Sequence, residues 1–131
     1  MSSNVLGHIL LDLNETTPAI EASAVISVDG MLLYSALPLG MDGDLASAMS
    51  SALLAVGVRA STVLSRGKVE HLLVKSAGHY ILVIPAGESA LVAFWVAENA
   101  QMDGVFLAAH QLATQTREWF AVNGITCRET W

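Results

Sequence analysis

Four histidines are the side chains of this sequence best suited to bind a metal ion: His8, His71, His79 and His110. Zinc sites usually take their ligands at short, recurring spacings such as CxxC or HxxxH. No such pair occurs among these histidines, and no carboxylate recurs beside them at ligand spacing. We therefore expect neither a metal ion nor another cofactor.

Nucleophilic and nucleotide chemistry also lack their usual motifs. The sequence contains no GxSxG, GxGxxG or GxxxxGK[ST] pattern. Cys127 is the only cysteine, and it lies near the C-terminus without an obvious partner. A free, unreactive thiol is the simpler interpretation of it. We therefore expect a protein that is not an enzyme and that does not itself hydrolyse a nucleoside triphosphate.

Two arginines could act on the active site of another protein. An arginine finger supplied in trans speeds nucleotide hydrolysis by about 10³–10⁵-fold, and Arg59 and Arg66 are the candidates. Both fall near the expected end of a helix, where a cation ordinarily interacts with the helix dipole or with a carboxylate. That ordinary role is the preferred interpretation. The six Lys and Arg residues are scattered along the chain, so no basic stripe for nucleic acid or anionic lipid is expected.

The balance of apolar and charged residues points to association. Hydrophobic residues make up 53% of the 131 residues and charged residues only 14%, against about 25% charged in a typical soluble domain. A single small domain has too few polar groups here to cover its surface, so part of that surface is expected to be buried in an oligomer or complex. The charge-free runs are shorter than the roughly 18 residues that a membrane span needs, so no membrane insertion is expected.

The compartment signals favour the cytoplasm. The first residues, MSSNVLGHILLDLNE, lack a basic segment and meet acidic residues early, so they do not predict a signal peptide. A single cysteine cannot form an internal disulfide, which is typical of a reducing compartment. We expect one domain over residues 1–124, followed by a short tail over 125–131.

Hydrophobic periodicity predicts three helices and five strands in the order α-β-β-α-β-β-β-α, an α/β (more strictly α+β) class with a mostly antiparallel sheet. The Asp29-Gly30 pair between two apolar runs predicts a hairpin with a type I′ turn. The last two strands are almost wholly apolar and should be central, whereas the third is charged and should be an edge. The expected elements are a helix over 3–13, strands over 20–28 and 31–34, a helix from Asp42 or Asp44 to about 64, strands over 69–75, 79–86 and 90–97, and a helix from about 101–103 to 122.

The second helix is the most informative element, because residues 45–58 carry no charge. A surface helix normally keeps a charged face toward water. We expect one face of this helix to lie on the sheet and the other to meet another protein, although both faces could instead serve one monomeric core. The expected sheet-facing residues are Leu45, Met49, Leu53, Val56, Ala60 and Val63, and the expected partner-facing residues are Ser47, Ser50, Ser51, Leu54, Val58 and Ser61.

Three stretches, together with this order of elements, resemble the roadblock family of dynein light chains, in its prokaryotic branch. They are AVISVDGMLLYSALP, DGDLASAMSSALLAVGVRASTVLSRGKVEHLLVK and GHYILVIPAGESALVAFWVAENAQMDGVFLAAHQLA, and the similarity covers about residues 5–120. The resemblance implies a five-stranded antiparallel sheet with the second helix on one face and the first and third helices on the other. This arrangement is a profilin-like layered sandwich.

The resemblance also implies a homodimer and a partner. Family members pair their third strands and second helices about a two-fold axis. Bacterial relatives bind small Ras-like GTPases on a surface that includes the second helix, and some stimulate GTP hydrolysis by positioning GTPase residues without donating a catalytic group. On this basis the expected dimer interface is Ser51, Gly57, Val69, His71, Leu73 and Lys75, and the expected GTPase-binding residues are Ser47, Ser50, Leu54, Val58 and Ser61.

Three hypotheses follow for the function. The first is a cytoplasmic homodimer that binds a Ras-like GTPase and regulates or localises it. The second is a light-chain-type scaffold with the same dimer but no GTPase partner. The third is a small-molecule sensor on a similar sandwich, which would need a concave pocket with converging polar groups. In any of these, His71 on the expected edge strand could make dimerisation depend on pH, although a solvated side chain is the simpler interpretation.

Overall fold

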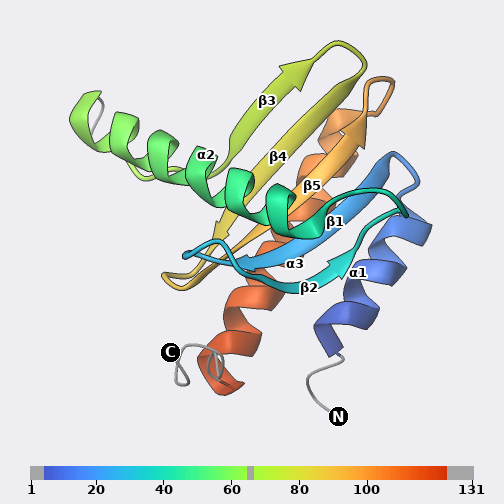
Figure 1. Ribbon diagram of the computed structural model, residues 1–131, viewed down its shortest axis with the longest axis horizontal. Coiled ribbons are helices and arrows are strands. Elements are labelled where there is room, and N and C mark those ends of the chain that lie inside the picture. The colour runs from blue at the N-terminus through green and yellow to red at the C-terminus, as the bar shows by residue number, and fades with distance from the viewer. Residues whose placement is uncertain (1–4, 65–66, 124–131) are drawn as a thin grey trace.

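The computed structural model describes residues 5–64 and 67–123, and its elements follow the predicted order (Figure 1). Helices α1, α2 and α3 span Val5–Thr16, Gly43–Leu64 and Met102–Asn123. Strands β1 to β5 span Ile20–Ser27, Leu32–Ala36, Leu72–Ser76, His79–Ala86 and Ala90–Ala97.

All five strands form one antiparallel sheet in the order β2-β1-β5-β4-β3. No residue of β5, at its centre, is exposed, which explains why that strand is apolar on both faces. The predictions that β4 and β5 are interior strands and that β3 is an edge are confirmed. Because β3 pairs only with β4, its outer side is an open sheet edge.

The helices cover the sheet from both sides, α2 on one face and α1 with α3 on the other, as predicted (Figure 1). Alternate residues of the central strands feed two separate cores. Phe94 packs with Leu10 of α1 and Leu112 of α3, whereas Val83 and Ala93 pack with Leu54 of α2. Burial of each large side chain stabilises the fold by about 1.5–3 kcal/mol. Each core therefore holds its own helical layer on one face of the sheet.

The β1–β2 hairpin is correctly placed, but its turn differs from the prediction. The Gly30 amide donates to the Ser27 carbonyl and the Ser27 amide donates to the Met31 carbonyl, each at 2.9 Å. Three residues therefore lie between Ser27 and Met31, not two, and a register shift after Val25 absorbs the extra one. Gly30 adopts a φ of 94°, the left-handed conformation that glycine tolerates best. The type I′ prediction is wrong, because the loop has three residues and not two.

Several element boundaries also differ from the prediction. Strand β1 ends at Ser27 and not at residue 28, and β2 spans Leu32–Ala36 and not residues 31–34. Helix α1 continues to Thr16, whose hydroxyl donates to the Asp12 carbonyl at 2.9 Å. Strand β3 starts at Leu72 and not at Val69, because the preceding residues leave the sheet to pack on the helices. The predicted start at residue 3, Arg66 and the tail over 125–131 with Cys127 lie outside the described residues.

Asp42, and not Asp44, caps the first turn of α2. The Leu45 amide donates to Oδ1 of Asp42 at 3.1 Å. Asp42→Ala should therefore lower the free energy of unfolding by about 1 kcal/mol in urea denaturation at one protein concentration. Asp44→Ala is the matched control and should cost less, because Asp44 contributes only through the helix dipole. An equal loss in both variants would show that the Asp42 hydrogen bond is not the cap.

Candidate interaction surface

The inner face of α2 consists of small side chains that lie directly on the sheet. Ser47, Ser50 and Leu54 are 1%, 2% and 7% exposed. The Ser47 hydroxyl donates to the Gly43 carbonyl at 2.7 Å, and the Ser51 hydroxyl donates to the Val28 carbonyl of the hairpin at 2.7 Å. Because a backbone carbonyl accepts from the buried Ser47 hydroxyl, the burial of this side chain costs little. Small residues let the helix lie close to the sheet.

The prediction that Ser47, Ser50 and Leu54 bind a partner is therefore wrong, since the chain's own sheet covers them. Two of the residues expected at the dimer interface are also engaged within the chain. Ser51 bonds the hairpin, and a Cβ on Gly57 would lie 3.5 Å from Leu72 of β3. The remaining partner-facing candidates lie at the margin of this face: Val58 is 44% exposed, and the Ser61 hydroxyl donates to the Gly67 carbonyl at 2.6 Å.

The outer face of α2 carries a stripe of large apolar side chains, which is named the α2 stripe below. Exposed fractions are 59% for Leu45, 57% for Met49, 68% for Val56 and 70% for Val63. Their spacing of four and seven residues places them on one side of the helix. These residues were predicted to face the sheet, and that prediction is wrong. Helix α2 therefore has two faces as predicted, but Ser47, Ser50 and Leu54 lie on the sheet while the stripe lies outside. Leu53 is half-buried, and Val58 is exposed as predicted.

The α2 stripe is long as well as apolar. By length and composition alone, α2 could cross a membrane, the only described helix of which this is so. In this chain α2 packs on one face of the sheet (Figure 1). Its buried residues are Ser47, Ser50 and Leu54, and the stripe residues remain exposed. An exposed apolar strip of this length is typical of a surface that another protein covers.

The open edge of β3 lies beside α2, because Gly57 stands over Leu72 at the start of that strand. Leu73 is 37% exposed and Lys75 is exposed. Val69, just before the strand, is half-buried and packs with the α2-side core. Of the predicted dimer residues, Leu73 and Lys75 are thus accessible on the edge strand, whereas Val69 mainly contributes to the core.

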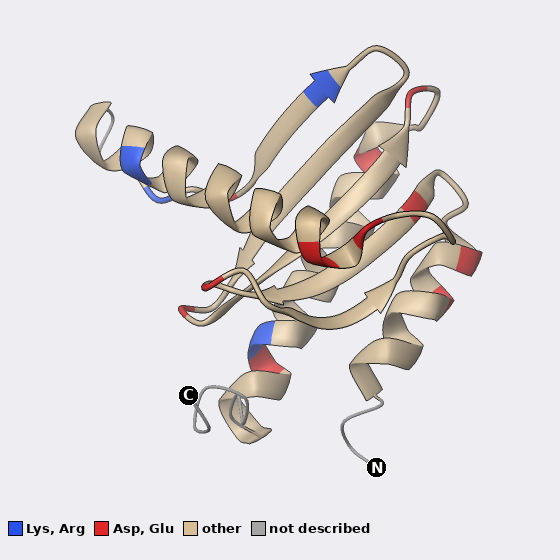
Figure 2. Cartoon of the chain, viewed as in Figure 1, with Lys and Arg blue, Asp and Glu red and all other residues tan. Residues whose placement is uncertain are grey.

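Charges are sparse around the α2 stripe (Figure 2). Asp44 lies at the start of the helix, and Arg59 is its single cation among the described residues. Arg59 borders a hollow on the outer face lined by Val56, Ala60 and Val63. From Leu45 to Val58 the helix therefore carries no charge that an apolar partner would have to desolvate, and Arg59 borders the stripe beyond that point.

Two of the four histidines meet, a contact that the sequence analysis missed. Nδ1 of His71 and Nε2 of His110 lie 3.2 Å apart although 39 positions separate them in the chain. His79 pairs at 3.5 Å with Glu21 instead. Within residues 5–64 and 67–123, no group of three or more His, Cys, Asp or Glu side chains is placed to hold a metal ion.

A hollow of about 600 Å³ lies between α1 and α3, on the opposite side of the sheet from the α2 stripe. Its lining includes His8, Asp12, Gln111 and Gln115. Polar groups around a hollow are what the sensor hypothesis requires.

Comparison with known proteins identifies the family. A model of the Roadblock/LC7 domain matches residues 6–94, which run from α1 into β5 and include both the α2 stripe and the β3 edge. The chain belongs to the Roadblock/LC7 family. Domains of this family are non-catalytic interaction modules. An exposed apolar surface, such as the α2 stripe, is a feature that an interaction module needs.

Relatives of this Roadblock/LC7 chain are prokaryotic. The uncharacterized protein MJ0310 of Methanocaldococcus jannaschii is 32% identical over 88 residues, which cover 67% of this chain and 76% of the relative.

Solved structures share the fold. The Roadblock/LC7 domain from Streptomyces avermitilis superimposes with a TM-score of 0.81 at 19% identity, covering 88% of this chain and 97% of that domain. The structure described as MglB with tetrameric arrangement gives a TM-score of 0.82 at 16% identity, covering 95% of this chain and 93% of that one.

Proposed function

We propose that this Roadblock/LC7 chain is a cytoplasmic homodimer that binds a small Ras-like GTPase and regulates or localises it without donating a catalytic group. Two copies would meet through the α2 stripe and the open edge of β3. The dimer would then present the rest of the α2 side to the GTPase.

The exposed α2 stripe is the observation that carries this proposal. Four large apolar side chains more than half exposed on one helix are unfavourable in water, because apolar area gains about 25 cal/mol per Å² when it is buried. The adjoining β3 edge offers unpaired backbone groups. Because the α2 stripe and the β3 edge are neighbours, a single two-fold contact would cover both. In such a contact each patch faces the equivalent patch of the second copy.

The proposal has two parts, self-association and GTPase binding, and the comparisons support the first more than the second. MglB, which has the same fold, has been solved in a tetrameric arrangement, so self-association is known for one protein of this shape. The GTPase partner rests on the resemblance of the sequence to bacterial roadblock proteins. A scaffold without a GTPase partner would show the same α2 stripe and the same edge strand.

A direct binding measurement tests the GTPase half. The purified chain is titrated against a Ras-like GTPase encoded in the same genome, loaded with GDP or with a non-hydrolysable GTP analogue, and binding is followed by biolayer interferometry. We expect binding in at least one nucleotide state. No binding in either state, by a chain that dimerises, would favour the scaffold.

Arg59 provides a test of how a GTPase would be regulated. Arg59→Ala is expected to change any stimulation of GTP hydrolysis by no more than about twofold, because the proposed role is to position residues of the GTPase. An arginine finger would instead lose about 10³-fold or more. Phosphate release under single turnover measures the rate. Arg59→Lys is the matched control, since it keeps the charge but not the planar guanidinium.

A further inference from the structure

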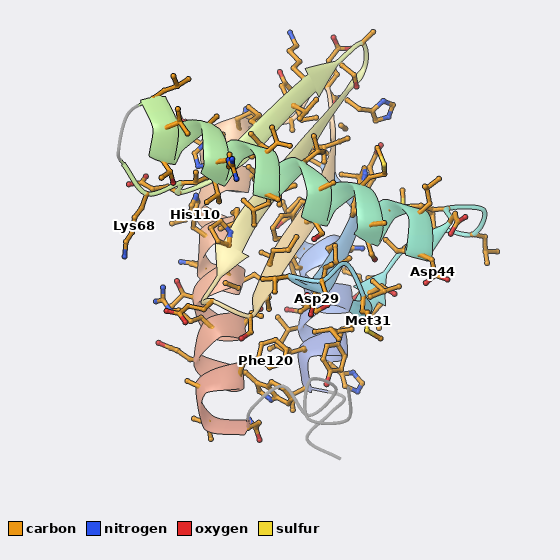
Figure 3. The ribbon with its side chains drawn as sticks, turned by 60° about the vertical axis from the view of Figure 1, so that its left-hand side comes forward. Asp29, Met31, Asp44, Lys68, His110 and Phe120 are labelled. Carbon is orange, nitrogen blue, oxygen red and sulfur yellow. The ribbon has the colours of Figure 1, made fainter. Side chains whose placement is uncertain are left out.

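The contact between His71 and His110 joins two elements that are distant in the chain. His71 is the last residue of the segment that leads into β3, residues 67–71, and His110 lies on α3. Figure 3 labels His110 and Lys68, which belongs to this leading segment. Besides the 3.2 Å contact between ring nitrogens, the His71 ring lies against Phe106 of α3, with centroids 4.8 Å apart and an interplanar angle of 31°. The His71 ring therefore contacts α3 in two ways, through Nδ1 with His110 and through its face with Phe106.

The hydrogen bond depends on the number of protons that the two rings carry. One nitrogen must donate an N–H and the other must offer a lone pair. The bond therefore exists when both rings are neutral, and it becomes charge-assisted when one ring is protonated. When both rings are protonated, two N–H groups face each other and two positive rings lie 5.3 Å apart between centroids. The contact then turns from attractive to repulsive.

No neighbouring charge removes this repulsion among the described residues. The segment that leads into β3 carries Lys68 and Glu70, α3 carries Asp103 and Arg117 two helical turns away on either side of His110, and β3 carries Lys75. None of these makes an ion pair with either ring in the part of the chain that the structure describes. A metal ion is a poorer occupant than a proton, because the pair supplies only two of the four ligands that zinc needs.

The position of the pair gives the contact a consequence for β3. Val69 packs into the core on the α2 side of the sheet, whereas His71 packs on α3 on the other side. The leading segment therefore wraps the sheet edge, and its last residue precedes Leu72, the first residue of β3. The histidine contact thus joins the residue that precedes β3 to helix α3.

We propose that the His71–His110 pair is an acid-sensitive latch that holds the start of β3 in place and releases it when both rings are protonated. Histidine side chains ordinarily take up a proton between about pH 8 and 5. The stabilisation is present while at least one ring is neutral and is lost as the pH falls. If β3 forms part of the dimer contact, which rests on the proposed function, the dimer weakens in the same pH range.

Hydrogen–deuterium exchange tests the latch independently of the dimer. Protection of the β3 amides, corrected for intrinsic exchange at each pH, should fall about five- to tenfold between pH 7.5 and 5.0 in the native chain, as expected for one hydrogen bond. In His71→Gln and His110→Gln, protection should no longer change with pH. His8→Gln, on the exposed surface of α1, is the matched control and should behave as the native chain does.

Two results would overturn the latch: β3 protection that does not change with pH in the native chain, or a pH response that persists in both glutamine variants. Nitrogen-15 NMR of the histidine rings in the native chain gives a second readout that needs no variant. At pH 7.5 it should show an N–H of one ring hydrogen-bonded to an unprotonated nitrogen of the other. At pH 5.0 it should show N–H groups on all four nitrogens. A mass in solution that stays monomeric while β3 protection still falls with acid would support the latch and refute the dimer.

Discussion

Val56→Asp is expected to convert the proposed homodimer into monomers without unfolding the chain. Val56 is 68% exposed in the middle of the α2 stripe, so an aspartate there is solvated in the monomer. In a dimer the same carboxylate would be desolvated with only Arg59, three residues along the helix, as a possible partner, so its burial would still cost several kcal/mol. A cost of about 3 kcal/mol raises the dissociation constant more than 100-fold. Light scattering after size-exclusion chromatography, from about 1 to 100 μM, measures the mass.

Leu11→Asp is the matched control for this prediction. Leu11 is 53% exposed on α1, which covers the other face of the sheet. The substitution adds the same charge to a helix surface that the proposed dimer leaves free, so its mass should equal that of the native chain. A native chain that remains monomeric at 100 μM, or a Val56→Asp variant that still dimerises, would contradict the assignment of the α2 stripe to the dimer.

Much of the architecture was predictable because apolar patterning and turn residues agree along most of the chain. Strands β4 and β5 begin and end where predicted, since Gly78 and Gly87 mark the turns and both adopt positive φ. The edge position of β3 was predicted from Glu70, His71 and Lys75, of which only Lys75 lies in the strand. The strand nevertheless starts later than expected, because Val69 packs with the core on the α2 side and His71 packs on α3. No local pattern in the sequence predicts these contacts.

The orientation of α2 was not predictable from its sequence. Without charges, neither face is marked as the one that meets water. Hydrophobicity favoured burial of the Leu45–Val63 side, yet the structure buries the serine side. Serine hydroxyls lose their usual preference for water when backbone carbonyls accept their hydrogen bonds, as Ser47 and Ser51 show. The large side chains then remain outside, which agrees with the proposed contact with another copy.

Contacts between distant residues also escaped prediction. His71 and His110 are 39 positions apart, and neither belongs to a ligand motif. Only the path of the segment around the β3 edge brings them together. The sequence identified His71 as a candidate for pH dependence, but its partner ring required the fold.

A pair of truncations on one helix tests the orientation of α2 most directly. Leu54→Ala should lower the free energy of unfolding by about 2–5 kcal/mol, because Leu54 is 7% exposed in the core between α2 and the sheet. Leu45→Ala removes the same atoms from a side chain that is 59% exposed and should cost less than about 0.5 kcal/mol. Both are measured by urea denaturation in the Val56→Asp background, so that dissociation does not contribute.

The difference between the two variants distinguishes the two orientations of the helix. Both substitutions change leucine to alanine within α2, so helix propensity contributes equally and only burial differs. A larger loss in Leu45→Ala would mean that the stripe faces the sheet and that the serine side is free for a partner. With the observed orientation, Leu54→Asp would abolish partner binding only by unfolding the chain. Probes of the interface therefore belong on the outer stripe, where a charge can be added to a chain that still folds.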